Sequence, residues 1–452
     1  MKPYFTYNKD AYIAAIGPSV WAKLGPEKWF DNYVIAVDNS RGYNADYVID
    51  LDIRTSNGRA LTTQKIIDTQ IFADIAQSDL EGYKFLVYKP VTKPTSLNED
   101  RFISNNERLG KYEDKKVFRD IFNGHIQIPR HTIMSLTDFV AIDTDTWYDS
   151  TTAQLGTPLV IQDNLNSGGR GTFIVSSKQG LQDAIKVLSH EKVGTHVIVS
   201  EFIQAMERSI QICIGRESIT VGPLQQQLVR NPELLNPESR GGVFFCGGKL
   251  LFNIDTALQA QIDSIVQSVS DVLRADGYKG IFGLDLLVDA SGTVNVIEIN
   301  ARTTGILPLL NEQATSLPLY LVHILELLGE SYELPQHDAA AIMKPYEELS
   351  GPQSFVILFN TTHGPAYLDN SIQTGNYTFQ AGALQRIDTQ PRWNPQADVM
   401  VQCIATKEYP SRPNLKLCNI FLKHTGFDDN GALTDEARTI IDTFKKHVVN
   451  KQ

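Results

Sequence analysis

Two apolar stretches joined by a tight turn constrain the fold most strongly. Gly-Leu-Asp-Leu-Leu-Val-Asp at 283–289 is followed by a Ser-Gly turn and by Val-Asn-Val-Ile-Glu-Ile-Asn-Ala-Arg at 294–302, which is typical of a β-hairpin. Side chains two residues apart leave the same face of a strand, so Glu298 and Asn300 project together, and antiparallel pairing places Asp285 opposite them. Such oxygen ligands suit Mg²⁺, which leaves its other positions to phosphate and water. A solvated strand face is the alternative.

The hairpin resembles the metal-binding hairpin of the ATP-grasp superfamily, whose pattern is an Asp or Glu, a spacer, and then Glu-x-Asn-x-Arg. Asp285, Glu298, Asn300 and Arg302 match that pattern residue by residue. A solvated face also explains poorly why Asn, which strands disfavour, shares one side with Glu and Arg. The resemblance implies that the first three residues hold one or two Mg²⁺ ions that bridge the ATP phosphates. It implies that Arg302 approaches the transferred phosphoryl group or the acyl phosphate.

The length and the order of elements predict several domains, because 452 residues exceed a single ordinary core. Strands and helices alternate over 1–105, which predicts a small parallel α/β domain, and prolines punctuate its end. The resemblance implies the ATP-grasp fold, with two α+β lobes, 106–200 and 201–335, that hold ATP between them. Residues 336–452 are expected to form a small C-terminal α+β domain.

Hydrophobic periodicity predicts the individual elements. Besides the hairpin, the expected strands are 12–16, 33–37, 47–49, 84–87, 159–162, 172–175, 197–202, 209–214, 355–359, 377–379 and 399–405. The expected helices are 63–76, 113–121, 181–188, 257–275, 318–328 and 434–448.

The helix that starts at Glu113-Asp114-Lys115-Lys116 carries the first of three further motifs. An ordinary charged helix start is the alternative, because acidic residues are favoured near the positive end of the helix. This helix start resembles that of ATP-grasp enzymes, which carry Asp-Lys at the same place. The resemblance implies that Lys115 contacts the nucleotide phosphates, with Lys116 as the second candidate.

A Gly-rich loop between two strands, 159–175, is the second motif. Its backbone N–H groups can close over phosphate oxygens, although a purely structural turn fits equally well. The resemblance implies a flexible lid on the triphosphate, formed by Ser167, Gly168, Gly169 and Gly171. Gln162 stands where the family usually has a second phosphate-binding Lys, and an amide can hydrogen-bond a phosphate but brings no charge. Arg170 is expected to supply the positive charge that Gln162 lacks; alternatively, Gln162 marks a sub-branch of the family.

The third motif, Val197-Ile-Val-Ser-Glu-Phe-Ile followed by Glu207, resembles the adenine hinge of the family. An edge strand with a solvated Glu is the alternative. The resemblance implies that the backbone of Glu201, Phe202 and Ile203 reads the adenine edge, with Ser200 competing with Glu201 for the adenine-contacting position. Glu207 is expected either to meet the ribose hydroxyls or to brace a phosphate-binding Lys.

The composition excludes several classes of protein. No apolar stretch is long enough to span a membrane, no secretory signal is visible at the start, and a net charge of −11 argues against a nucleic-acid binder. The four cysteines lack Cys-x-x-Cys spacing and are expected to be free thiols. A cytoplasmic protein, compatible with a homodimer, is the expectation.

What ATP-grasp enzymes share, and what the resemblance implies here, is activation of a carboxylate. ATP would convert it to an acyl phosphate, and an amine would displace phosphate to give an amide or peptide bond, with ADP and phosphate released. Gln162, the lid ending Gly-Arg-Gly-Thr and the C-terminal domain are similar to the amino-acid and peptide ligases of natural-product pathways, such as the pheganomycin type. A thiol or hydroxyl acceptor, and a nucleotide-binding module without turnover, are the alternatives.

Overall fold

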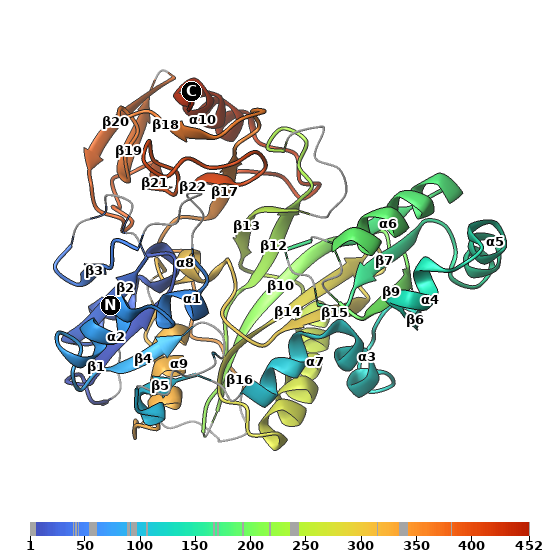
Figure 1. Cartoon of the computed structure of the whole chain (residues 1–452), viewed down its shortest axis with the longest axis horizontal. Helices are drawn as coiled ribbons and strands as arrows, with labels where there is room; N and C mark the ends of the chain where they lie inside the picture. Colours follow the sequence, from blue (N-terminus) through green and yellow to red (C-terminus); the bar gives the residue numbers. More distant parts are fainter. Residues whose placement is uncertain are drawn as a thin grey trace.

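In the computed structural model the chain forms three parts: an N-terminal part, a middle part made of two lobes, and a C-terminal part (Figure 1). The residues that it describes are 6–38, 40, 43, 45–53, 61–87, 91, 97–104, 107–165, 168–169, 171–191, 194–216, 218–235, 244–313, 315–333, 342–380 and 382–451. Ser167 and Arg170, which were expected in the lid, lie outside them.

The N-terminal part is a parallel sheet with helices, as predicted. Its strands lie in the order β3-β2-β1-β4-β5 and every pairing is parallel. The helix expected over 63–76 is two helices, because the Thr69 hydroxyl accepts from Phe72 N at 3.1 Å and caps a new start. The elements are β1 Tyr12–Ile16, β2 Asn32–Val37, β3 Val48–Asp50, β4 Lys84–Val87, β5 Phe102–Ile103, α1 Thr63–Ile67, α2 Gln70–Gln77, and the 3₁₀ turns η1 Trp21–Lys23, η2 Pro26–Lys28 and η3 Glu99–Arg101.

The first lobe is an antiparallel sheet in the order β6-β9-β7-β8. Helix α5 was not predicted, because its sequence is polar and Thr-rich and only Tyr148, Thr151 and Leu155 of it are buried. The elements are η4 Glu107–Glu113, α3 Lys115–Phe122, β6 His131–Ser135, α4 Leu136–Val140, α5 Thr144–Leu155, β7 Leu159–Asp163, β8 Thr172–Val175, α6 Lys178–Glu191 and β9 His196–Glu201.

The second lobe and the C-terminal strands share one sheet of twelve strands in the described part of the chain. Its main path runs β15-β14-β10-β12-β13-β17-β22-β21-β19-β20. The twelve strands are β10 Ala205–Ile214, β11 Ile219–Val221, β12 Leu224–Val229, β13 Phe245–Leu251, β14 Gly280–Asp289, β15 Val294–Asn300, β16 Ile342–Met343, β17 Ser354–Phe359, β19 Gly375–Gln380, β20 Ala383–Asp388, β21 Val399–Cys403 and β22 Lys416–Leu422. Outside this sheet, β18 Ala366–Leu368 and β23 Val448–Asn450 pair with each other. The helices are α7 Thr256–Ala275, α8 Leu307–Leu310, α9 Leu319–Leu328 and α10 Asp435–Lys445.

The joint between the second lobe and the C-terminal strands is the pairing of β13 with β17. Gly247 lies opposite Val356, and a Cβ on Gly247 would fall 2.2 Å from the carbonyl oxygen of Phe355. Only glycine allows this approach. The boundary expected between 335 and 336 falls at residues outside the described part of the chain and stays a prediction.

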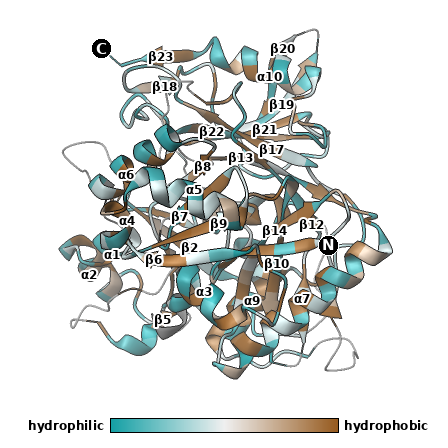
Figure 2. Cartoon of the chain, turned by 90° about the vertical axis from the view of Figure 1, so that its right-hand side faces the viewer, coloured by the Kyte–Doolittle hydropathy of each residue, from teal (hydrophilic) through white to brown (hydrophobic). Residues whose placement is uncertain are grey.

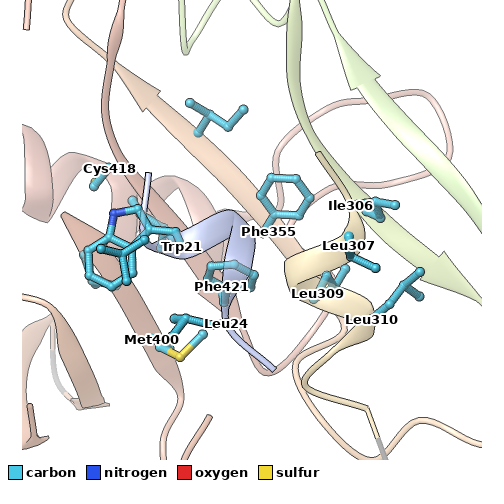
Figure 3. Close-up of a cluster of buried hydrophobic side chains, with 14 of the residues drawn as sticks. Trp21, Leu24, Ile306, Leu307, Leu309, Leu310, Phe355, Met400, Cys418 and Phe421 are labelled. Carbon is cyan, nitrogen blue, oxygen red and sulfur yellow. The ribbon is translucent and has the colours of Figure 1, made fainter. Parts of the chain in front are cut away.

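One hydrophobic cluster ties the three parts together around the short helix α8 (Figure 3). Figure 3 shows side chains from the N-terminal part, from α8 and from the C-terminal strands in one cluster: Trp21, Leu24, Ile306, Leu307, Leu309, Leu310, Phe355, Met400, Cys418 and Phe421. Burying such surface is the main favourable term in folding. Figure 2 agrees, since the inner strands are largely hydrophobic while hydrophilic residues recur along the outer helices.

Ion pairs reinforce the same junction. Arg392 of the C-terminal part pairs with Glu27 at 2.9 Å and with Glu312 at 2.7 Å. All four cysteines are buried and free, as expected from their spacing. Among the described residues, no helix combines the length and the hydropathy needed to cross a membrane.

Candidate active site

A cavity of about 560 Å³ lies between the two lobes. Its walls come from the first-lobe hairpin β7–β8, from the segment between β9 and β10, and from one face of β12, β14 and β15. Most of the predicted site residues line it: Lys115, Gln162, Gly168, Gly169, Glu201, Phe202, Ile203, Glu207, Asp285, Glu298, Asn300 and Arg302. Gly171 is buried beside the cavity and does not line it.

The hairpin β14–β15 brings the three predicted metal ligands together. Asp285 pairs directly with Glu298, and the register then slips by one residue before Leu286 pairs with Val296. A bulge of this kind re-aims the side chains beside it. The Asp285 carboxylate accepts from Asn300 Nδ2 at 3.0 Å. The predicted set of Asp285, Glu298 and Asn300 therefore shares one patch of the cavity wall.

The second oxygen of Asp285 accepts from Gln227 Nε2 of β12 at 2.7 Å. The sequence did not indicate Gln227, because its position depends on the pairing of strands far apart in the chain. Burial and the nearby charge of Glu298 raise the pKa of Asp285 to about 7, while the bonds from Asn300 and Gln227 oppose that rise. Two crowded carboxylates of this kind are stabilised by a cation between them.

The donor set fits Mg²⁺. It offers two carboxylates and one amide oxygen on the wall of a cavity open to phosphate and water, as this ion requires. Among the described residues, no group of three or more His, Cys, Asp or Glu could hold a metal ion by itself. A bound Mg²⁺ would therefore take its remaining ligands from the substrate and water.

Lys115 begins α3 and points at this patch. Asp114 caps the helix, accepting from Lys116 N at 2.8 Å. Lys115 is 4% exposed, and its Nζ lies 3.3 Å from Glu298 Oε1. Lys116 instead pairs with Asp120 at 2.6 Å on the outer face of the helix. Of the two expected lysines, only Lys115 lines the cavity.

Arg119 supplies the charge that Gln162 lacks. It lies one helical turn after Lys115, is 1% exposed, and lines the cavity. Its Nη2 donates to Gln162 Oε1 at 3.3 Å and its Nη1 to the Lys115 carbonyl at 3.2 Å. Burial lowers the pKa of Arg119 to about 10, with Glu298 opposing the shift, so it remains a cation at neutral pH. The sequence signal that was missed is the i, i+4 spacing from Lys115.

The Gly-rich loop is anchored at its base to the same helix. The Asn164 side chain donates to Asp114 Oδ2 at 2.8 Å. The backbone carbonyl of Asn164 accepts from Lys115 N at 2.9 Å. Gly168 and Gly169 have φ of +67° and +77°, which favours glycine, and both line the cavity. The described part of the loop thus lines the same cavity as Lys115.

The segment after β9 keeps three residues, Phe202 to Gln204, outside the sheet. Glu201 is held by Arg130: its carboxylate accepts from Arg130 N at 2.8 Å and Nε at 2.7 Å, and its own N–H donates to the Arg130 carbonyl. Phe202 and Ile203 lie between β9 and β10, so the sheet does not use their backbone groups. Ser200 pairs within the sheet and is 3% exposed.

Glu207 lies on β10 in the same cavity. Burial raises its pKa, and the nearby charge of Arg230 opposes that rise. The carboxylate of Glu298 pairs with Lys115. Both predicted roles of Glu207, contact with the ribose hydroxyls and support of a phosphate-binding Lys, stay predictions.

Arg302 lies just beyond the hairpin and is fixed on three sides. Its Nε lies 2.8 Å from Glu113 Oε1, its Nη2 donates to Asn300 Oδ1 at 3.0 Å, and its Nη1 to the Thr303 carbonyl at 3.2 Å. Glu113 belongs to the helix-start motif, and because it lies far from Arg302 in the sequence, this pairing was not predicted. The guanidinium is held beside the predicted metal ligands.

The comparisons with known proteins identify the domain that contains this cavity. The ATP-grasp domain family matches residues 112–306. The carbamoyl phosphate synthase large chain of Caldanaerobacter subterraneus subsp. tengcongensis is 22% identical over 200 residues, 44% of this chain and 18% of that protein. The phosphoribosylamine–glycine ligase of Leptospira interrogans is 26% identical over 152 residues, 32% of this chain and 35% of that protein. The solved structure of carboxyaminoimidazole ribonucleotide synthase from Aspergillus clavatus complexed with ATP has a TM-score of 0.59 at 12% identity, and the match covers 97% of this chain and 99% of that one.

The chain contains an ATP-grasp domain. The predicted ATP-grasp domain is confirmed over residues 112–306, and the ATP-grasp fold is confirmed. The matched region spans only 18% and 35% of the two curated relatives, so their likeness establishes the domain and leaves the reaction of the whole chain to be argued from its cavities.

A second cavity of about 690 Å³ adjoins the ATP-grasp domain. It shares Arg302, Thr304 and Gly305 with the first cavity. Its other walls come from the N-terminal part, from α9 and from the C-terminal strands, which contribute Lys416 among other residues. The sequence did not indicate this cavity, because its walls come from all parts of the chain.

Proposed function

We propose that the chain is an ATP-dependent carboxylate–amine ligase. The observation that carries the proposal is the junction of the two cavities at Arg302 and Thr304. One side of this junction offers cations, a Gly-rich loop and a metal-binding patch, as a nucleoside triphosphate requires. The other side has the volume for an organic substrate. A carboxylate held at the junction would lie between the two.

ATP is proposed to bind in the first cavity. The backbone of Phe202 and Ile203 would read the adenine edge, and Glu207 would meet the ribose. Lys115 and Arg119 would offset the phosphate charges together with the backbone N–H groups of Gly168 and Gly169 in the Gly-rich loop. Asp285, Glu298 and Asn300 would hold Mg²⁺, which would supply positive charge against the negative charge of the phosphates.

The proposed reaction has two displacements. A carboxylate oxygen attacks the γ-phosphorus, the bond to the β,γ-bridging oxygen breaks, and ADP leaves. Arg302 would hold the carboxylate and stabilise charge on the transferring group. A neutral amine then attacks the acyl carbon, phosphate leaves, and the amine loses one proton. No covalent enzyme nucleophile is needed, so positioning and electrostatics carry the catalysis.

Amino acids or peptides are the proposed substrate class, in line with the likeness to peptide ligases. The test is ADP and phosphate release with candidate acids, in the presence of an amine, a thiol, an alcohol or no acceptor, with mass spectrometry of the product. The proposal expects an amide only with the amine. Glu298→Gln should abolish release while ADP still binds. A thioester or ester, or ATP binding without release for any mixture, would overturn it.

A further inference from the structure

The charged groups that the structure describes on the wall of the second cavity are all cations. Lys23, Lys416 and Arg302 line it, and none of its described lining residues is Asp or Glu. Most of the remaining wall is apolar, with Val20, Trp21, Leu86, Tyr320, Leu327 and Ile404 among the lining residues. An apolar cavity with charge of one sign selects ligands of the opposite sign.

Lys416 is the cation with the least compensation. It opens β22, and among the described residues none accepts a hydrogen bond from its Nζ. Part of its side chain is exposed to solvent, yet desolvation by the surrounding protein lowers its pKa. The group that acts on it electrostatically is the buried thiol of Cys246, which provides no counter-charge because burial raises its pKa to about 11. The ammonium thus stands at the cavity without a described anion to pair with.

Lys23 is better compensated. It is buried at the end of η1, and its Nζ donates to the Ser19 carbonyl at 2.5 Å. Burial lowers its pKa to about 8, although Asp38 lies near enough to favour its charge. Asp38 is itself buried and does not line the cavity. Lys23 therefore adds positive potential to the cavity, and no carboxylate on the described wall cancels it.

His323 adds a neutral donor. The Ile281 backbone N–H, which can only donate, is bonded to His323 Nδ1 at 3.0 Å. Burial lowers the pKa of His323 to about 4, so the ring is neutral and its proton must sit on Nε2. His323 lines the cavity as a group able to donate to an oxygen anion.

We propose that this cavity binds an apolar organic acid that carries no free ammonium group, with Lys416 as a second cation, besides Arg302, that positions its anionic end. The inference rests on the proposed function and narrows its substrate class. A free amino acid would place its ammonium among cations with no carboxylate on the described wall, which costs free energy both by repulsion and by desolvation. An amino acid or peptide with an acylated amino group avoids both costs.

Isothermal titration of the whole chain with matched ligands tests which sign of ligand charge the cavity binds. This measurement does not depend on turnover. 3-Phenylpropanoate and N-acetyl-L-phenylalanine should bind, whereas L-phenylalanine, which adds one ammonium to the same body, should bind at least about tenfold more weakly, the effect of one unfavourable charged contact. Phenethylamine should not bind. Equal or tighter binding of L-phenylalanine, or no binding of either acid at millimolar concentration, would overturn the inference.

Variants at Lys416 test the positioning role. Lys416→Met should weaken binding of the acids by about tenfold or more and leave ADP affinity unchanged, and Lys416→Arg should retain most of it. Unchanged acid binding by Lys416→Met would refute the role. The two proposals fail separately: acids that bind but never support ADP release sink the ligase, and release with free amino acids alone sinks the acid class.

Discussion

Replacing Arg119 with methionine removes a charge while keeping most of the side-chain volume. The structure makes Arg119 the cation beside Gln162 on the wall of the proposed phosphate site. A charge-assisted hydrogen bond contributes about 1.5–3 kcal/mol, which corresponds to a loss of about 10- to 100-fold in nucleotide affinity. Titration with ADP and Mg²⁺, and ADP release with a turned-over acid, measure binding and catalysis separately.

The same substitution has a structural cost. The methionine side chain cannot donate to Gln162 Oε1 or to the Lys115 carbonyl, the two bonds that Arg119 makes at 3.3 and 3.2 Å. We expect a stability loss of about 1–3 kcal/mol in urea unfolding. The matched control is Lys116→Met on the same helix, which removes an exposed ion pair with Asp120 and should change neither stability nor affinity by much.

A second substitution separates charge from fold. In the Arg119→Met background, Gln162→Lys restores a cation at the strand position where the family usually carries Lys, so nucleotide affinity should recover. In the parent chain the same Gln162→Lys would place two cations within about 4 Å of each other and should lower stability. If Arg119→Met binds ADP like the parent chain, or if Gln162→Lys fails to restore lost affinity, Arg119 is only a packing residue and the compensation argument is wrong.

Three further predictions concern the metal patch, pH and the inter-domain joint. Glu298→Ala should remove the Mg²⁺ dependence of ADP binding in calorimetry with and without EDTA, and retained dependence would contradict the metal assignment. Burial lowers the pKa of His323 to about 4, so between that pH and the ordinary pKa near 6.5 the unfolded chain binds a proton that the folded chain does not. The free energy of unfolding should therefore fall as the pH falls from about 7 to about 4. Urea titrations should show a smaller fall for His323→Asn. Gly247→Ala, whose Cβ would meet the Phe355 carbonyl at 2.2 Å, should lower the melting temperature, whereas Gly364→Ala, with open space around it, should not.

Local patterns were enough to predict the hairpin and the proximity of Asp285, Glu298 and Asn300. Glu298 and Asn300 are two residues apart, and their tight turn from Asp285 leaves one antiparallel pairing, so period and turn together placed all three. The first strands of the parallel domain were predicted for the same reason, since continuous apolar runs separated by helices mark a covered parallel sheet. In the hairpin the contact partners lie close in sequence, and in the parallel domain the apolar run of each strand was recognisable by itself.

Contacts between distant segments were not predictable in the same way. Gln227 reaches Asp285 only because β12 and β14 flank β10, and Glu113 meets Arg302 from the opposite end of the ATP-grasp domain sequence. No local period encodes such pairs. Arg119 is the instructive exception, because its spacing from Lys115 was visible but an ordinary charged helix face explained it equally well.

The C-terminal part, expected to be an appendage, contributes to both cavities. Its strands continue the sheet of the second lobe through β13 and β17, Asn430 lines the first cavity and Lys416 lines the second. Because a sheet edge exposed by removing these strands would leave unpaired backbone groups and apolar surface, the C-terminal part cannot be a module that merely follows the ATP-grasp domain. In the proposed ligase, substrate choice and the integrity of the catalytic face would depend on the same strands, and a change of specificity would have to be compatible with the pairing of β22 with β17.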